Sequence, residues 1–477
     1  MEESKRLLSI GKTYEAFNRL KSILPKLKDT KDEWKVHELI GAVFHDLGDA
    51  EGVVQAYLYA AQKDRYLRTQ REHYSNYLFA LHYLNSITNE ELANEHFVYN
   101  NLFENEHLSL NITSKFPQSK ITIGYIAPQF TESSSARFYE ALLTEYNRDE
   151  FIVKCFSLSY ESDKFTSFID SNVDSMIILK DFSIEEAAHA IVDESVDILF
   201  DLGGHTDGGL TLQIMSYKPA PIQLSGIGWF DTTGLKAIDY FMTDNYLAPI
   251  GHEKFFNEKL LRLNSAFAFV ASENLKRAVQ KFSILDAPHS PFTFASFNNF
   301  MKITNDYLKC VKKILNLVEN SKFVIQDTTM IPARKLEMEK RLKKLRMPLD
   351  RIEVRLGNDD YLNDYDSIDI ILDTFPYNGG TMTATALYMG IPVISLYGTR
   401  HSSRFGADIL RLAEMSELIA NDTKEYVHKA VSLAKDQDKL TELKKTLNER
   451  LNNSKLLNTK SFVSELEYKY KTLYNKF

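Results

Sequence analysis

The feature that most constrains this chain is a rhythm of short apolar segments separated by helix-like stretches. It begins near Ile121 and starts again after Pro291. Nearly continuous apolar runs predict strands that are buried on both faces, and the amphipathic stretches between them predict crossover helices. Such alternation predicts a parallel sheet covered by helices on both sides. The two series therefore predict an α/β protein with two doubly wound, Rossmann-like lobes and a cleft where ligands bind beyond the carboxyl ends of the strands.

The boundaries of these elements follow from the apolar runs. The expected strands of the first series are Ile121–Ala127, Phe151–Ser157, Ser175–Leu179, Asp197–Leu202, Ile222–Gly228 and Tyr240–Thr243. Those of the second series are Phe292–Phe297, Ser321–Gln326, Arg351–Arg355, Ile368–Leu372 and Pro392–Tyr397. The expected helices between them include Ser135–Tyr146, Ile184–Glu194, Thr304–Val318, Ala333–Leu345 and Thr383–Met389.

The first hundred or so residues have a different texture, which predicts helices. Leu39, Val43 and Leu47 recur at helical spacing. Small and aromatic residues stand where the helix pairs of tetratricopeptide repeats use them: Gly41, Phe44, Gly48, Tyr57 and Ala60. The pattern predicts a short unit of helical repeats, and a generic helical cap on the next domain is the alternative.

Composition limits the class of protein. Lysine and arginine number 57 against 65 aspartate and glutamate, a net charge of −8, which argues against general nucleic-acid binding. The two cysteines are far apart, which argues against a disulfide framework and fits a reducing compartment. The first residues, MEESKRLLSIGKTYEAF, are charged, unlike a signal peptide, and no apolar run reaches the roughly 18 residues of a membrane span. We therefore expect a cytoplasmic protein without a membrane span.

The strongest chemical signal is the segment LDTFPYNGGTMTATALYMGIPV, Leu372–Val393. An apolar strand ends at Asp373, a tight turn follows through Asn378, Gly379 and Gly380, and a helix opens near Thr381, which Thr381 or Thr383 could cap. The free N–H groups of such a helix start attract phosphate. An ordinary strand–turn–helix connection is the alternative interpretation.

Two further loops carry candidate groups. Lys302, with Asn299 just before it, follows the first strand of the second series, and a lysine is well suited to phosphate. His205, in the segment Asp201–Thr206, is expected to face the cleft, where it could bind a sugar or act as a base. For both side chains, a plain polar loop position is the alternative. The Asp364-Tyr-Asp366 motif lies in an acidic stretch that is more typical of a solvated helix face than of a metal site.

Several motifs together resemble the O-linked N-acetylglucosamine transferase family. KPAPIQLSGIGWFDTTG (Lys218–Gly234) and DILFDLGGHT resemble its first lobe. FASFNNFMKIT, DTFPYNGGT and GTRHSSRFGADIL (Gly398–Leu410) resemble its second lobe. SNYLFALHYLNSITNEELANEHFVY (Ser75–Tyr99) resembles the linker after its tetratricopeptide repeats, and KSFVSELEYKYKTLYNKF resembles its last helix.

The resemblance implies a GT-B fold and a division of the chain. Residues 1–115 would be a helical, tetratricopeptide-like domain with linker, 116–285 the first, acceptor-side lobe, 286–425 the second, nucleotide-sugar lobe, and 426–477 C-terminal helices. It implies an inverting, metal-independent glycosyltransferase that moves a sugar, N-acetylglucosamine from UDP-GlcNAc, to a serine or threonine of a protein or peptide. No cofactor or metal is expected, and the partners are the nucleotide-sugar and the polypeptide acceptor.

The resemblance also assigns residues. Lys302 matches the lysine that contacts the donor diphosphate, and Asn299 stands where members often have glutamine near the nucleotide. Gly228 lies in the loop near the sugar, and His205 is the candidate base, with proton loss to water or to the donor phosphate as the alternative. The diphosphate is expected on the turn and helix start formed by Asn378, Gly379, Gly380, Thr381, Met382 and Thr383.

Some positions depart from the family pattern. Ser133 replaces a histidine that follows the first strand, Tyr361 and Asp364 stand where members often have histidine and arginine, and Thr385 replaces an acidic residue. The nucleotide or sugar could therefore differ, or activity could be lost. The second hypothesis is accordingly a catalytically silent adaptor that holds a polypeptide for a partner transferase. The acceptor, the general base and the oligomeric state are not specified by the sequence.

Overall fold

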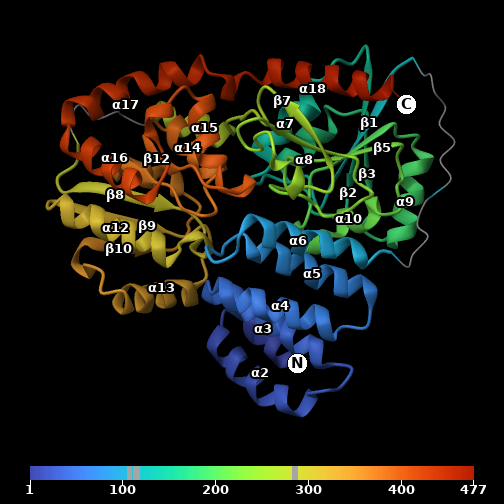
Figure 1. The fold of residues 1–477 in the computed structure, drawn as a ribbon, viewed down its shortest axis with the longest axis horizontal. Helices are drawn as coiled ribbons and strands as arrows, with labels where there is room; N and C mark the ends of the chain where they lie inside the picture. The colour runs from blue at the N-terminus through green and yellow to red at the C-terminus, as the bar shows by residue number, and fades with distance from the viewer. Residues whose placement is uncertain (105–109, 111–118, 282–287, 477) are drawn as a thin grey trace. The chain divides into compact units, whose positions relative to one another are not determined.

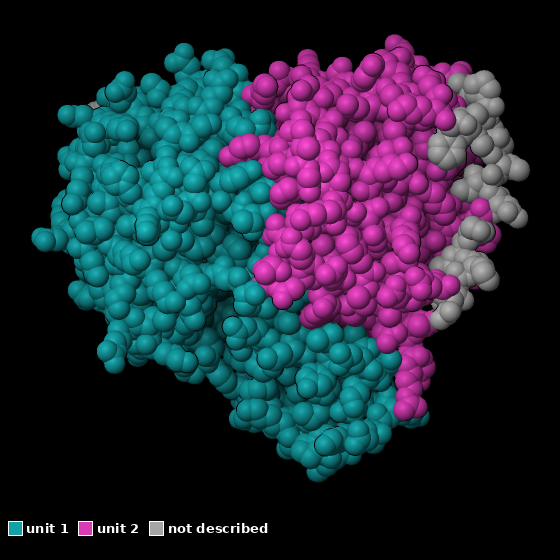
Figure 2. Space-filling model, in the orientation of Figure 1, with its two compact units in different colours: residues 1–64, 80–86, 271–454 teal, residues 65–79, 87–270, 455–477 magenta. Residues whose placement is uncertain are grey.

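The computed structural model describes residues 1–104, 110, 119–281 and 288–476 (Figure 1). The chain divides into two compact units, coloured separately in Figure 2. Unit 1 contains residues 1–64, 80–86 and 271–454, and unit 2 contains residues 65–79, 87–270 and 455–477. Each unit is built around one sheet, so the expectation of two Rossmann-like lobes is confirmed.

Unit 2 contains a seven-stranded sheet of order β3-β2-β1-β4-β5-β6-β7. All its strand pairs are parallel, with Tyr125 of β1 in register with Cys155 of β2 and Phe200 of β4. The strands are β1 (Ile121–Ala127), β2 (Phe151–Ser157), β3 (Ser175–Ile178), β4 (Ile198–Asp201), β5 (Ile222–Ser225), β6 (Tyr240–Asp244) and β7 (Lys259–Leu263). The intervening helices are α7 (Ala136–Thr144), α8 (Lys164–Asp170), α9 (Ile184–Asp193) and α10 (Leu210–Met215), with the 3₁₀ turns η1 (Thr206–Gly209) and η2 (His252–Phe255).

Unit 1 contains a six-stranded parallel sheet of order β10-β9-β8-β11-β12-β13. The strands are β8 (Phe292–Phe297), β9 (Ser321–Gln326), β10 (Ile352–Arg355), β11 (Ile370–Leu372), β12 (Val393–Leu396) and β13 (Ile419–Ala420). The helices are α11 (Glu273–Lys281), α12 (Asn305–Leu317), α13 (Pro332–Lys344), α14 (Thr381–Tyr388), α15 (Phe405–Leu412), α16 (Thr423–Lys435) and α17 (Gln437–Asn452). The 3₁₀ turns are η3 (Phe300–Lys302), η4 (Leu349–Arg351), η5 (Tyr361–Ser367), η6 (His401–Ser403) and η7 (Ser416–Leu418).

The N-terminal region is helical, as predicted. It contains α1 (Glu2–Ser9), α2 (Thr13–Leu27), α3 (Glu33–Leu47), α4 (Ala50–Lys63), α5 (Leu67–Leu81) and α6 (Asn89–Asn101). The small residues of α3 and α4 allow the two helices to approach: a Cβ on Gly41 would lie 3.1 Å from the Tyr57 ring, and one on Gly52 would lie 2.5 Å from the Phe44 ring. Gly48 ends α3 in the left-handed conformation, with φ of 70°, which glycine adopts without strain.

The C-terminal helices are divided between the units. Helices α16 and α17 belong to unit 1, whereas η8 (Lys455–Leu457) and α18 (Thr459–Tyr474) belong to unit 2. Apolar side chains of α18 join the core cluster of the seven-stranded sheet, among them Phe462, Leu466 and Tyr470. The last helix therefore contributes to the core of the seven-stranded sheet of unit 2. Among the described residues, no helix is long and apolar enough to span a membrane.

Candidate active site

A buried carboxylate shapes the turn after β11. Asp373 is fully buried, and its Oδ1 accepts hydrogen bonds from the N–H groups of Thr374 (2.9 Å) and Gly379 (2.7 Å). Its Oδ2 accepts one from the Ser395 hydroxyl (2.6 Å) on β12. These bonds fold residues 374–379 back over the end of the strand. Gly379 suits this position because a Cβ there would lie 2.6 Å from Thr383 Oγ1.

Helix α14 begins directly after this turn. Gly380 occupies its N-cap position and, as a glycine, offers no side-chain cap. The expectation that Thr381 or Thr383 caps the helix is therefore wrong, because both lie within α14 rather than before it. The first N–H groups of a helix have no partner within the helix, and they form a positively polarised site suited to an anion.

Lys302 contacts the same turn. It ends η3, which follows β8, and its Nζ donates to the carbonyl oxygen of Asn378 (2.9 Å). The same Nζ lies 3.8 Å from the centroid of the Tyr377 ring. The structure thus brings together Lys302 and the turn from Asn378 to Thr383, which the sequence separates by about 76 positions.

Burial and mutual charge shift the pKa values of Lys302 and Asp373. Burial lowers the pKa of Lys302 to about 8, and the carboxylate of Asp373 opposes that shift. Burial raises the pKa of Asp373 to about 6, against its hydrogen bonds and the charge of Lys302. A dianionic phosphate near Lys302 would favour the ammonium form, because an adjacent negative charge raises the pKa of an amine.

Asn299 holds the loop that carries Lys302. Its side-chain oxygen accepts from the N–H of Met301 (3.0 Å) and from Nη1 of Arg334 (2.8 Å). That oxygen is therefore used within the loop, and the expected role of Asn299 near the nucleotide stays a prediction. Arg334 and Asp373 were not predicted as site residues. Asp373 could have been found as a carboxylate at the end of an apolar strand, whereas nothing in the sequence distinguishes Arg334 from its basic neighbours on α13.

His205 is enclosed within unit 2. Its side chain is fully buried, with Nδ1 2.9 Å from Ser75 Oγ and Nε2 2.9 Å from the carbonyl oxygen of Thr233. Because a carbonyl only accepts, Nε2 carries the proton and Nδ1 accepts from Ser75. Burial lowers the pKa of His205 well below its usual range. The expectation that His205 faces an open cleft is wrong, because both ring nitrogens are occupied and the side chain has no exposed surface.

Gly228 lies in the loop after β5, which is closely packed against the loop after β4. Its φ is 94°, and a Cβ there would overlap the carbonyl oxygen of Leu202. Trp229, next in sequence, packs edge-on against His205 with ring centroids 4.9 Å apart. Glycine is therefore required at 228 by both backbone conformation and space. Its expected place beside the sugar stays a prediction.

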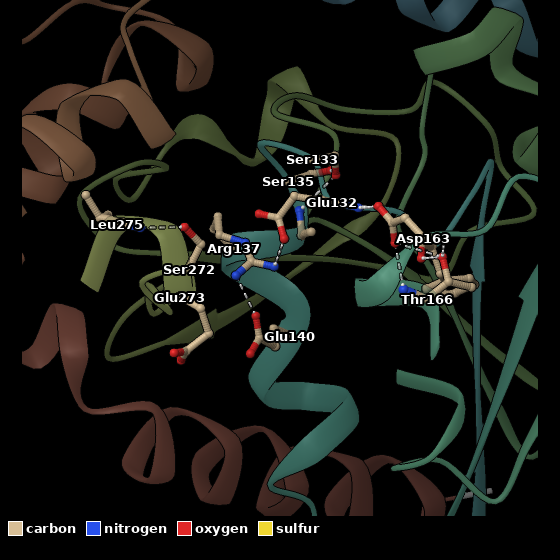
Figure 3. A network of polar contacts seen from close by, with 12 residues as sticks. Glu132, Ser133, Ser135, Arg137, Glu140, Asp163, Thr166, Ser272, Glu273 and Leu275 are labelled. Atoms are coloured by element: carbon tan, nitrogen blue, oxygen red, sulfur yellow. Dashed lines mark hydrogen bonds and ion pairs between the residues drawn. The ribbon is translucent and has the colours of Figure 1, made fainter. Parts of the chain in front are cut away.

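Ser133, expected to depart from the family pattern, bonds to the start of α7. Its hydroxyl accepts from the N–H of Ala136 (3.2 Å), the first residue of α7 (Figure 3). Beside it, Arg137 bridges Glu132 (3.3 Å) and Glu140 (2.9 Å). The loop after β1 thus ends in a compact network of charged and hydroxyl groups in place of an imidazole.

The other expected departures lie in unit 1. Asp364, in η5, accepts from the side-chain amides of Gln326 and Asn358, each at 2.8 Å. Tyr361 begins the same turn, and Thr385 is buried within α14 with 2% of its surface exposed. Within the described residues, no three histidine, cysteine, aspartate or glutamate side chains gather as a metal-binding group.

Comparisons with known proteins agree with this geometry. Residues 101–287 and 271–466 match the family model described as Glycosyl transferase family 41. A curated relative from Arabidopsis thaliana, the probable UDP-N-acetylglucosamine–peptide N-acetylglucosaminyltransferase SPINDLY, is 32% identical over 412 residues, which cover 84% of this chain and 45% of that protein. SPINDLY of Solanum lycopersicum is 30% identical over 413 residues, covering 84% and 44%. The chain thus spans less than half the length of these relatives.

A solved structure shows the same fold. The O-GlcNAc transferase of Thermobaculum terrenum, determined as a point mutant, superimposes with a TM-score of 0.88. The match covers 98% of this chain and 88% of that one, at 24% sequence identity. The likeness extends over the N-terminal helices as well as both sheets.

Proposed function

Because the chain belongs to glycosyl transferase family 41, we propose that it transfers a sugar from a nucleoside-diphosphate sugar to a polypeptide side chain. The curated relatives are named for UDP-N-acetylglucosamine and peptides, so UDP-GlcNAc is the first donor and a serine or threonine hydroxyl the first acceptor that we propose. The observation that carries this proposal is the 2.9 Å contact of Lys302 Nζ with the carbonyl oxygen of Asn378, in the turn that leads into α14.

The proposed reaction is an inverting displacement. The acceptor oxygen attacks C1 of the sugar from the face opposite the phosphate, and the bond between C1 and the phosphate oxygen breaks as the diphosphate leaves with the electron pair. Negative charge therefore grows on the leaving phosphate in the transition state. Donors that are already aimed at growing charge stabilise it more than they stabilise the ground state.

This chain offers two groups for that task without a metal ion. The ammonium group of Lys302 supplies a full positive charge, and the N–H groups of residues 380–383 supply the polarised helix start. We propose that Asn378, Gly379, Gly380, Thr381, Met382 and Thr383 bind the diphosphate, with Asn299 nearer the nucleotide and Gly228 near the sugar. Metal independence follows from this assignment as part of the proposal.

The acceptor proton needs a destination other than His205. A neutral imidazole with both nitrogens engaged takes up no proton unless its pocket opens. We propose that the proton passes to water or to a phosphate oxygen of the donor, and that His205 positions the loop at Thr233. The N-terminal helices are proposed to present the polypeptide acceptor.

A donor screen tests the proposal. Thermal unfolding is followed with UDP, GDP and their sugars, with EDTA present. A ligand that binds only the folded state at 100 times its dissociation constant adds about 2.7 kcal/mol of stability. We expect a clear rise in Tm with one nucleotide series and transfer of a radiolabelled sugar from it to peptide. Peptide binding without turnover of any donor would instead favour the adaptor hypothesis.

A further inference from the structure

One buried arginine joins three segments of unit 1 that are distant in sequence. Arg334, on α13, is 1% exposed. Its Nη1 donates to Asn299 Oδ1 (2.8 Å) and lies 3.4 Å from both carboxylate oxygens of Asp327. Its Nη2 donates to the carbonyl oxygen of His45 (2.9 Å). The guanidinium therefore contacts the η3 loop, the end of β9 and the end of α3.

Two of these partners hold the backbone that carries Lys302. Asn299 Oδ1 also accepts from the N–H of Met301 (3.0 Å), and Asp327 Oδ1 accepts from the N–H of Phe300 (3.1 Å). Two acceptors of the Arg334 guanidinium, Asn299 and Asp327, thus also bind N–H groups of the turn that ends at Lys302. A shift of the guanidinium would move both of these acceptors.

The third partner belongs to the N-terminal helices. The His45 carbonyl lies in the last turn of α3, where it also accepts from the N–H of Gly48 (3.0 Å). A Cβ on Gly48 would lie 3.8 Å from the Cβ of Phe300, so the end of α3 lies directly against η3. Burial and the neighbouring Arg334 lower the pKa of His45 to about 4, which keeps this imidazole neutral.

A second set of hydrogen bonds joins the N-terminal helices to α13. The hydroxyl of Tyr14, on α2, donates to Glu337, and Lys340 Nζ donates to the Tyr14 oxygen (3.2 Å). Both α13 residues lie within two turns of Arg334. Helices α2 and α3 therefore each contact α13, α2 through Tyr14 and α3 through the carbonyl of His45.

Stability alone does not account for a buried arginine here. Replacing a buried ion pair with well-packed apolar residues is often neutral or stabilising, so such a pair is weak evidence for a stabilising role. What arginine offers is a rigid planar fork that reaches acceptors in fixed directions, which lysine cannot copy. The arrangement of Arg334 uses that property, because its two Nη atoms bond to different segments.

We propose that Arg334 is a positioning residue through which the end of α3 fixes the η3 turn, and with it the place of Lys302 Nζ at the diphosphate site. This inference rests on the proposed function for its effect on nucleotide binding. Its structural part, the coupling of α3 to η3 through Arg334, does not depend on that function.

The test compares Arg334→Lys with a matched control, Arg351→Lys. The Arg351 guanidinium likewise donates to several backbone carbonyls of unit 1, those of Leu315, Val318 and Ser321. None of these acceptors belongs to η3. Hydrogen exchange is measured on the full chain. We expect Arg334→Lys to speed exchange at the amides of Met301, Lys302 and Gly48, with β8 and β9 unchanged. Arg351→Lys should leave η3 as it is in the wild type.

Binding of UDP, or of the diphosphate that the donor screen selects, supplies a readout that a merely structural role would not move. We expect Arg334→Lys to weaken binding by about fivefold to tenfold, and to weaken it no further when Lys302 is already alanine. Additive losses in the double variant, or unchanged exchange at η3, would overturn the inference.

This design distinguishes failure of the proposed function from failure of the Arg334 coupling. If the wild type binds no nucleoside diphosphate, the proposed function fails while the exchange result still decides the coupling. If Arg334→Lys does not fold, Arg334→Gln, which shortens the side chain and removes the guanidinium, replaces it. Faster exchange at Met301 and Lys302 in that variant would support the coupling, and wild-type exchange there would refute it.

Discussion

Lys302 in unit 1 and His205 in unit 2 are the two candidate catalytic side chains, and they lie in opposite environments. Lys302 is half-buried, and its ammonium group contacts a carbonyl oxygen and an aromatic face in the turn before α14. His205 is fully buried, and both of its nitrogens are bound within the fold. Burial therefore makes Lys302 easier to deprotonate and His205 harder to protonate.

The difference suggests that Lys302 acts on the substrate, whereas His205 stabilises the fold. A group that stabilises charge in the transition state must be able to reach a ligand, and Lys302 has a polarised turn beside it for that purpose. A histidine with both nitrogens satisfied fixes the loops around it instead. The comparison predicts that changes at Lys302 affect rate and that changes around His205 affect stability.

The largest expected effect is on rate. Lys302→Ala should lower transfer on the order of 10²–10³-fold, because it removes a cation aimed at the leaving phosphate. Lys322→Ala, at a half-buried lysine of β9, is the matched control and should retain wild-type turnover. Initial rates with radiolabelled donor measure both. Equal rates for the two variants would contradict the proposed role of Lys302 in catalysis.

The next effect is on the stability of unit 2. Gly228→Ala should cost about 3 kcal/mol or more, because it adds a clash with Leu202 to the strain of a positive φ. Gly251→Ala has nearly the same φ, 93°, with nothing within 4 Å of the added Cβ, and should cost only about 1–2 kcal/mol. Urea unfolding followed by tryptophan fluorescence compares them. Equal costs would show that the loops after β4 and β5 are not rigidly packed.

A smaller loss is expected at His205. His205→Gln should destabilise the fold by about 1–3 kcal/mol, because at least one of its buried partners is left unsatisfied. The folded variant should keep the pH profile of wild-type turnover. His189→Gln, at an exposed histidine of α9, should change neither property. Loss of the acid limb of the profile in His205→Gln alone would identify His205 as the base after all.

The smallest expected effect is a pH dependence. With a pKa of about 8, Lys302 is protonated below that pH and loses its charge above it. The kcat/KM for the donor, which reports ionisations of the free enzyme, should therefore be constant below pH 8. Above pH 8 it should fall about tenfold per pH unit. Lys302→Arg, whose guanidinium stays charged at every accessible pH, should flatten that decline even if its rate is lower. A profile that is flat through pH 9 in the wild type contradicts the assignment.

The sequence predicts the fold well where local patterns determine it. Most of the strands from β1 to β6 and from β8 to β12 follow nearly continuous apolar runs, so their existence was predictable. The edge strands β7 and β13 were missed: KLLRL carries charges at its first and fourth positions, and β13 has only two residues. The attachment of α18 to the first sheet depends on tertiary packing, which periodicity alone does not reveal.

The site was predicted in part, for a related reason. The turn from Asn378 to Thr383 and the lysine at 302 both follow apolar strands, so their residue types and positions suggested a common edge of one sheet. The orientation of His205 could not be predicted, because it depends on Ser75 and Thr233, which are distant in sequence. Arg334 was missed because its three partners also come from separate segments.

The central claim is that Lys302 and the start of α14 bind a diphosphate together. Calorimetric titration of UDP, or of the diphosphate chosen by the donor screen, into the wild type and Lys302→Ala in EDTA tests it directly. The account predicts metal-free binding that weakens at least tenfold in Lys302→Ala and is unchanged in Lys322→Ala. Equal affinity in all three proteins, or binding that appears only when Mg²⁺ is added, would contradict it.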